Sequence, residues 1–70
     1  NSGQWDIEKE MLEVVELEGC VERTNLLNRF DKHQKWIVEA SLGDLVWNDI
    51  LKVSKEDEQY YYGLNNKPIC

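Results

Sequence analysis

Residues 30–64 read FDKHQKWIVEASLGDLVWNDILKVSKEDEQYYYGL, and they predict a helix followed by a β-hairpin. Asp31 is a suitable N-cap, and Gln34 follows at the spacing at which a cap and the third helical residue satisfy each other's backbone N–H groups. After Asn48 the residues become typical of strands at positions 50–53 and 59–64. The five polar residues between them, 54–58, contain no Gly or Asn-Gly pair, so we expect a long, mobile tip and not a tight turn.

The predicted helix carries two apolar stripes on roughly opposite sides, because residues three and four apart share a helix face. The stripes are Val38, Leu42 and Leu45 on one side, and Trp36, Ala40 and Trp47 on the other. One stripe is expected to pack in the core of the domain. The second needs the wing, a terminal segment or another molecule as its partner, so Trp36, Ala40 and Trp47 are a candidate protein interface.

A basic cluster opens the same helix, with Lys32, His33 and Lys35 in its predicted first turn. Cations there oppose the helix dipole at a cost of about 0.3–1 kcal/mol each, so their presence suggests a role other than helix stability. A phosphate bound at the helix N-terminus would be such a role, since it meets both free N–H groups and basic side chains. A solvated charge cluster is the alternative, and the sequence leaves both open.

Two further helices are predicted before this one. The first is amphipathic, is capped by Asp6 and ends at Gly19, and its buried face comprises Ile7, Met11, Val14 and Val15. The second opens at Glu22 or Thr24 and buries Leu26, Leu27 and Phe30. Only about one residue separates it from the third helix, which is the spacing of a helix-turn-helix.

The net charge of −6 is unevenly distributed along the chain. Residues 1–22 hold seven acidic residues and one lysine, whereas residues 23–55 hold six basic and four acidic residues, and residues 56–70 hold three acidic residues and one lysine. The acidic side of the first helix is either exposed to solvent alone or a docking surface for a basic partner. Residues 23–55 can therefore form a basic surface even though the net charge of the whole chain is negative.

Seventy residues predict a single domain, residues 1–70, with flexible ends at 1–5 and 65–70. The chain begins with Asn and not Met, so we expect it to be a processed product or a piece of a longer protein. There is no apolar run of membrane-spanning length and no signal segment, so we expect an intracellular protein, cytoplasmic or nuclear. Two cysteines and one histidine do not make a disulfide framework or a zinc site, and both Cys20 and Cys70 are interpreted as free thiols.

The predicted order of helix, helix, tight turn, helix and hairpin resembles a winged helix-turn-helix domain of the α+β class, with three helices followed by a two-stranded β-hairpin wing. The residues that carry the resemblance are 26–30 in the second helix, Leu42, Leu45 and Val46 in the third, and 50–53 and 60–64 in the wing. The resemblance spans residues 7–64. A weaker similarity, in residues 39–43, is to DEP domains, which are winged helices that bind proteins and membranes.

The resemblance implies DNA binding through the third helix and the wing, as in transcription or replication regulators. By position, the DNA contacts would be His33, Gln34, Lys32 and Lys35 on the helix, and Arg29, Lys52 and Lys55 on phosphates. The alternative is an acidic winged helix that binds a protein partner or forms a homodimer, because the outward stripe offers Trp36 and Ala40 where a reading helix needs polar side chains. We expect no enzymatic activity, no cofactor, no small-molecule substrate and no metal, since there is no phosphate-binding loop and little volume for a cleft.

Overall fold

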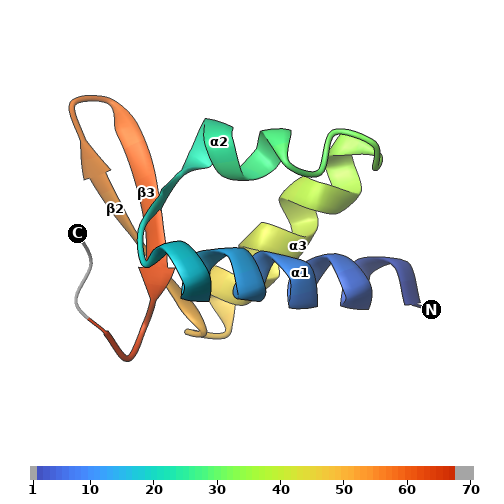
Figure 1. Ribbon diagram of the computed structural model, residues 1–70, viewed down its shortest axis with the longest axis horizontal. Helices are drawn as coiled ribbons and strands as arrows, with labels where there is room; N and C mark the ends of the chain where they lie inside the picture. Colours follow the sequence, from blue (N-terminus) through green and yellow to red (C-terminus); the bar gives the residue numbers. More distant parts are fainter. Residues whose placement is uncertain (1, 68–70) are drawn as a thin grey trace.

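The chain forms six elements in the order α1 (Ser2–Glu18), β1 (Val21–Glu22), α2 (Arg23–Asn28), α3 (Lys35–Trp47), β2 (Leu51–Glu56) and β3 (Gln59–Leu64). These come from a computed structural model, which describes the backbone of residues 2–67 and the side chains of residues 6–67. The α+β class is confirmed. The predicted hairpin is present as β2 and β3, but it belongs to an antiparallel sheet of three strands in the order β1-β3-β2, so the prediction of only two strands is wrong (Figure 1).

The core lies between α1, α3 and the sheet. Every element supplies at least one buried apolar side chain: Ile7, Met11, Val15, Val21, Leu26, Phe30, Val38, Leu42, Leu45, Leu51 and Tyr62. The predicted inner stripe of α3 is therefore buried, as expected from its helical spacing. Ser41 is also fully buried on this side of α3, and its hydroxyl donates a 2.8 Å hydrogen bond to the carbonyl of Ile37. That bond removes the cost of burying the hydroxyl.

Helix α1 ends where the sequence predicts and begins earlier. Gly19 has a φ of +81° and its N–H donates to the carbonyl of Val15 at 2.7 Å, so the glycine terminates the helix. Residues 2–5, which were expected to belong to a flexible end, are helical, and Asp6 therefore lies inside α1 and is not its N-cap. Residue 1 and residues 68–70 of the predicted flexible ends lie outside the described residues.

Helix α3 begins at Lys35, and its N-cap, Gln34, lies three residues after the predicted cap Asp31. The chain first turns beyond α2, with the N–H of His33 donating to the carbonyl of Phe30 at 3.0 Å. Gln34 is the N-cap residue, but its side chain accepts a 2.7 Å hydrogen bond from the indole N–H of Trp36 and caps nothing. Lys32 and His33 thus lie in the turn between the helices, and of the three basic residues only Lys35 is in the first turn of α3, where it opposes the helix dipole.

Helix α3 passes into β2 through a tight C-terminal cap. The N–H of Ile50 donates to the carbonyl of Leu45, the N–H of Asp49 donates to Val46, and Asp49 is left-handed at φ +61°. This pair of hydrogen bonds is the Schellman arrangement, here with Asp in the position where Gly is common. It reverses the chain, so that β2 starts directly beside the end of the helix.

The hairpin turn is shorter than predicted. Glu56 pairs with Gln59, so the turn consists of Asp57 and Glu58 alone, at φ +50° and +70°. Two central residues with positive φ define the primed turn that matches the twist of a hairpin, normally built from Asn-Gly. The absence of that pair led to the prediction of a five-residue loop, which is wrong.

Strand β1 was not predicted from the sequence. Its two residues pair with the middle of β3, Val21 opposite Tyr62 and Glu22 opposite Tyr61. The preceding Cys20 is disulfide-bonded, so the prediction of a free thiol at that position is wrong. Cys70, for which a free thiol was also predicted, lies outside the described residues.

Candidate functional site

The outward side of α3 is an exposed, largely apolar surface. We call this surface the α3 outer face and define it by Trp36, Ala40, Gly43 and Trp47, which lie at helical spacing. The side chains of Trp36 and Trp47 are 67% and 85% exposed, about 16 Å apart along the helix axis. No other element covers the predicted interface residues Trp36, Ala40 and Trp47 in the described part of the chain.

An open groove of about 450 Å³ extends from the α3 outer face to the sheet. Its apolar lining combines α3 with the two hairpin strands, and Val53 of β2 is 43% exposed within it. Carboxylates of Glu39 and Asp49 lie on its rim. The full lining is Arg23, Glu39, Leu42, Gly43, Val46, Trp47, Asp49, Val53 and Tyr62.

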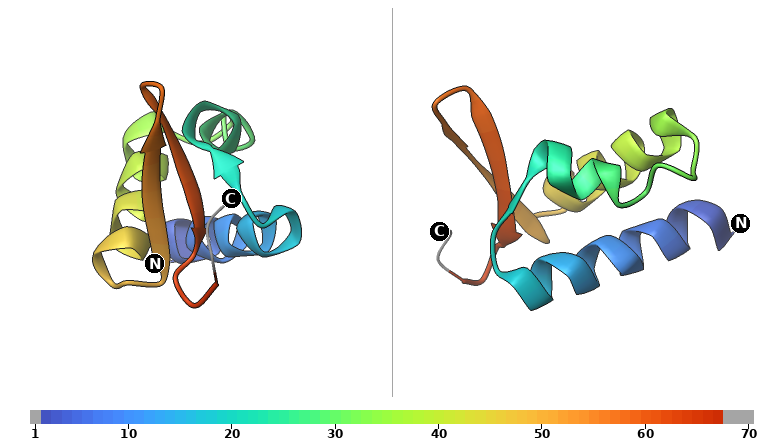
Figure 2. Two further views of the ribbon diagram at one scale, coloured as in Figure 1. Left: turned by 90° about the vertical axis from the view of Figure 1, so that its left-hand side faces the viewer. Right: turned by 45° about the horizontal axis from the view of Figure 1, so that its top comes forward.

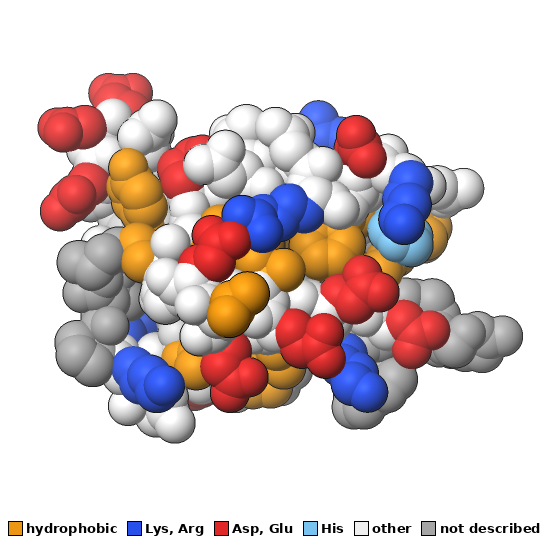
Figure 3. Space-filling view, in the orientation of Figure 1, with side chains coloured by type: hydrophobic (Ala, Val, Ile, Leu, Met, Phe, Trp, Pro, Cys, Tyr) orange, Lys and Arg blue, Asp and Glu red, His pale blue; other side chains and the backbone are white. Residues whose placement is uncertain are grey.

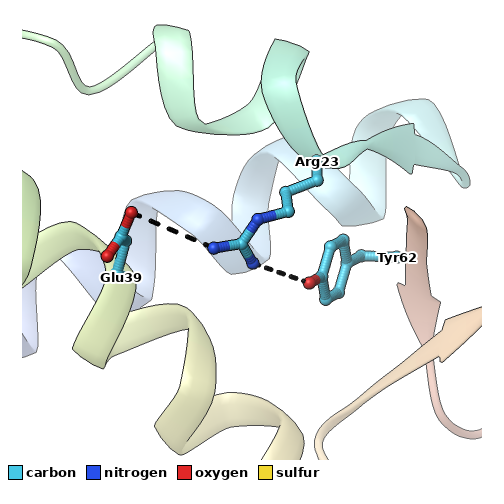
Figure 4. Close-up of polar contacts among 3 residues, drawn as sticks. All are labelled: Arg23, Glu39 and Tyr62. Atoms are coloured by element: carbon cyan, nitrogen blue, oxygen red, sulfur yellow. Dashed lines mark hydrogen bonds and ion pairs between the residues drawn. The ribbon is translucent and has the colours of Figure 1, made fainter. Parts of the chain in front are cut away.

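Arg23, one of the residues that line the groove, joins three elements (Figure 4). Its Nη1 donates a 3.0 Å hydrogen bond to the hydroxyl of Tyr62 on β3, and its Nη2 lies 4.0 Å from a carboxylate oxygen of Glu39 on α3. Tyr62 is buried, whereas the side chains of Arg23 and Glu39 are 38% and 41% exposed. The hydrogen bond therefore fixes the groove wall, and the ion pair adds little because it is largely solvated.

The predicted nucleic-acid residues do not form one surface. Lys32, His33, Gln34 and Lys35 lie at the turn between α2 and α3, whereas Lys52 and Lys55 lie on β2, and Figure 1 places that turn and the hairpin at opposite ends of the molecule's longest, 32 Å axis. Arg29 is in an ion pair with Glu18, and the ammonium of Lys55 lies 5.7 Å from the ring centre of Tyr60. Lys32 and Lys35 remain exposed.

Glu39 and Asp44 flank the α3 outer face, and most of the other acidic side chains lie on α1 and at the tip of the hairpin. Figure 3 shows a row of Asp and Glu side chains over α1 and a second group at the tip of the hairpin, with Lys and Arg between them. The view from the side shows β2 and α3 together on one side of the molecule, and β1 on the other (Figure 2, left).

Sequence reasoning found the two tryptophans and missed the rest of the groove. Helical spacing is sufficient to place Trp36 and Trp47 on one face. Val53, Arg23 and Tyr62 join that face only through the sheet, and no local pattern specifies such pairing. Strand alternation was an available signal for Val53, since it lies two residues from the buried Leu51.

Comparisons with known proteins add no relative: no family model matches the chain, and no significant similarity to curated proteins or to solved structures was found. None of the helices within residues 2–67 has the length and apolar character required to cross a membrane. In the same part of the chain, no three His, Cys, Asp or Glu side chains are grouped as metal ligands.

Proposed function

We propose that this chain is a non-enzymatic protein-interaction module that binds its partner through the α3 outer face and the adjoining groove. The observation that carries the proposal is the exposure of Trp47, 85%, beside the half-exposed Val53. Exposed tryptophan next to an apolar groove is rare on a solvated surface and frequent at interfaces, where Trp is enriched among the residues that dominate binding.

The proposal keeps the winged-helix arrangement as its structural interpretation. Support for it comes from the order of the elements, in which α3 follows α2 and the hairpin follows α3. The connection between α2 and α3 comprises six residues, 29–34, so the tight turn of about one residue predicted from the sequence is wrong. In this interpretation α3 occupies the position of the recognition helix. Its outward residues are apolar or small, and Glu39 and Asp44 flank them, so the surface is better suited to a protein than to a polyanion.

We infer the compartment from the disulfide at Cys20. Disulfides persist in oxidising environments and are rare where glutathione keeps thiols reduced. The disulfide at Cys20 therefore favours an oxidising compartment over the cytoplasmic or nuclear one expected from the sequence.

Photo-cross-linking tests the proposal. A photoreactive amino acid replaces Trp47 in one variant and Leu17 in a control, because Leu17 is equally exposed, at 86%, on α1. Both variants are irradiated in an extract of the source cells, with excess unlabelled protein or excess Trp47→Ser protein as competitors. We expect a discrete product from position 47 that the unlabelled protein suppresses and the Trp47→Ser protein does not. Equal products from both positions, or none from position 47, would contradict the proposal.

A further inference from the structure

Strand β2 has a free edge. In the sheet order β1-β3-β2, β2 is a six-residue strand with one neighbour among the described residues. Because the turn has two residues, the backbones of Glu56 and Gln59 hydrogen-bond to each other. In an antiparallel pair such positions recur at every second residue, and the bond from the N–H of Asn65 to the carbonyl of Ile50 follows this alternation. The even-numbered residues of β2 therefore bond to β3. The N–H and C=O groups of Leu51, Val53 and Lys55 point away from the sheet.

Such an edge is a template for another strand unless the protein blocks it. Proline, a bulge or a covering segment would do so, and β2 has none of these within the described residues. It carries two lysines, which discourage pairing with most strands. A partner strand must therefore be one whose side chains are compatible with these two lysines.

The charges of β2 change sign along its length. Lys52 and Lys55 come first, and Glu56, Asp57 and Glu58 follow at the tip. A second copy of the same strand in antiparallel orientation places its acidic end against the basic end of the first. With Ser54 opposite Ser54, Lys52 of each copy faces Glu56 of the other. Neither Lys52 nor Glu56 is in a salt bridge within the described residues.

We propose that the partner is a second copy of this chain, joined through antiparallel pairing of the two β2 strands in that register. The inference rests on the proposed function and specifies its partner. Opposite charges directly across a strand pair stabilise it, and the symmetry of the dimer supplies the Lys52–Glu56 contact twice. The register also places Val53 opposite Lys55, and both residues direct their free backbone groups outward. Moving the register so that Val53 faces Val53 removes both charge pairs.

The same dimer brings the groove beside Trp47 close to its two-fold axis. The two-fold axis of an antiparallel strand pair is perpendicular to the sheet, so α3 of each copy lies on the same side of the joined sheet. The groove between Trp47 and Val53 borders that axis from both copies. Hydrogen bonding between the two strands thus sets the orientation of the two copies, and the apolar groove contributes the apolar surface that the interface buries.

The net charge of −6 opposes self-association at long range. Six of the acidic residues are on α1 and not on β2, and at physiological salt the screening length is about 8 Å. The dimer is therefore expected at that ionic strength, and it should weaken when salt is removed.

Analytical ultracentrifugation of two charge reversals tests the inference. Lys52→Glu and Glu56→Lys each turn both cross-strand pairs repulsive, so each variant alone should have a dimer dissociation constant at least about tenfold higher than the parent. An equimolar mixture should form a heterodimer, because every pair then joins a Glu to a Lys. Lys9→Glu and Glu13→Lys are controls with the same charge changes at exposed positions of α1, and they should dimerise like the parent. Circular dichroism checks that each variant is folded.

Net charge alone predicts a different pattern, in which Glu56→Lys dimerises more strongly than the parent. That pattern, a mixture that does not recover dimerisation, or a monomeric parent at high micromolar concentration would each overturn the inference. A monomeric parent that still forms the position-47 cross-link to a different protein would retain the proposed function and exclude the second copy as its partner. A parent that neither dimerises nor forms that cross-link would reject both.

Discussion

Arg23 and Tyr62 join the beginning of α2 to the middle of β3 through a 3.0 Å hydrogen bond between the guanidinium and the phenolic hydroxyl. The two residues are 39 positions apart in the sequence, and their contact forms one wall of the groove. Because Tyr62 is buried while Arg23 is half-exposed, the structure assigns the bond mainly to fixing the position of the tyrosine ring.

Tyr62→Phe is expected to lower the free energy of unfolding by about 0.5–1.5 kcal/mol, since it removes this hydrogen bond and leaves the ring in place. Glu39→Gln is the control, because the 4.0 Å ion pair to Arg23 is solvated and its loss should change stability by less than about 0.5 kcal/mol. Urea denaturation measures both. A larger loss for Glu39→Gln than for Tyr62→Phe would reverse this assignment.

The two sides of α3 should respond differently to truncation. Leu45 is 1% exposed, and Leu45→Ala should cost about 2–5 kcal/mol, a large part of the stability of so small a domain. Trp47→Ala removes a larger side chain that makes few intramolecular contacts, so it should change the free energy of unfolding by less than about 0.5 kcal/mol. Thermal melting distinguishes the two, and equal melting temperatures would show that the faces of α3 are assigned incorrectly.

The hairpin turn stores backbone strain at Glu58, where φ is +70°. Glu58→Gly should stabilise the domain by about 0.5–1 kcal/mol, because glycine adopts this conformation without steric cost. Glu56→Gly, two residues earlier in a regular strand, should destabilise it by a similar amount. Chemical denaturation of the pair tests the turn assignment, which loses its basis if Glu58→Gly is the less stable variant.

Nucleic-acid binding is the alternative to the proposed function, and it has its own test. From the separation of the basic residues we expect no binding to mixed-sequence duplex DNA at about 50 mM salt. Binding that falls with salt by about 0.9 log units per neutralised phosphate would speak for the basic turn instead. Loss of that binding in the Lys32→Glu, Lys35→Glu double variant would identify the turn as its site and contradict the proposed function.

The sequence predicts those parts of the fold that depend on local periodicity. The buried residues Met11 and Val15 of α1 and Leu42 and Leu45 of α3 follow directly from helical spacing. The start of α3 was misplaced because Asp31 is a good cap by residue type, but the chain there is still turning away from α2 through the bond between His33 and Phe30.

Features that depend on distant residues were not predictable in this way. Strand β1 has two residues and no alternation to detect, and it exists because Tyr61 and Tyr62 lie beside it. The groove requires Val53 from the hairpin to lie beside Trp47 at the end of α3, which the Schellman turn at Asp49 brings about. With two cysteines at distant positions, spacing gave no signal for a disulfide at Cys20.

Fluorine NMR of protein labelled with fluorotryptophan tests the central claim, that the α3 outer face is the interaction surface. The three tryptophans give separate resonances, which Trp→Phe variants assign. On formation of the complex, we predict that the Trp47 resonance shifts and loses its sensitivity to solvent isotope, because the indole moves from water into the interface. A complex that leaves the Trp47 resonance unchanged, and the indole still sensitive to solvent, would contradict the account.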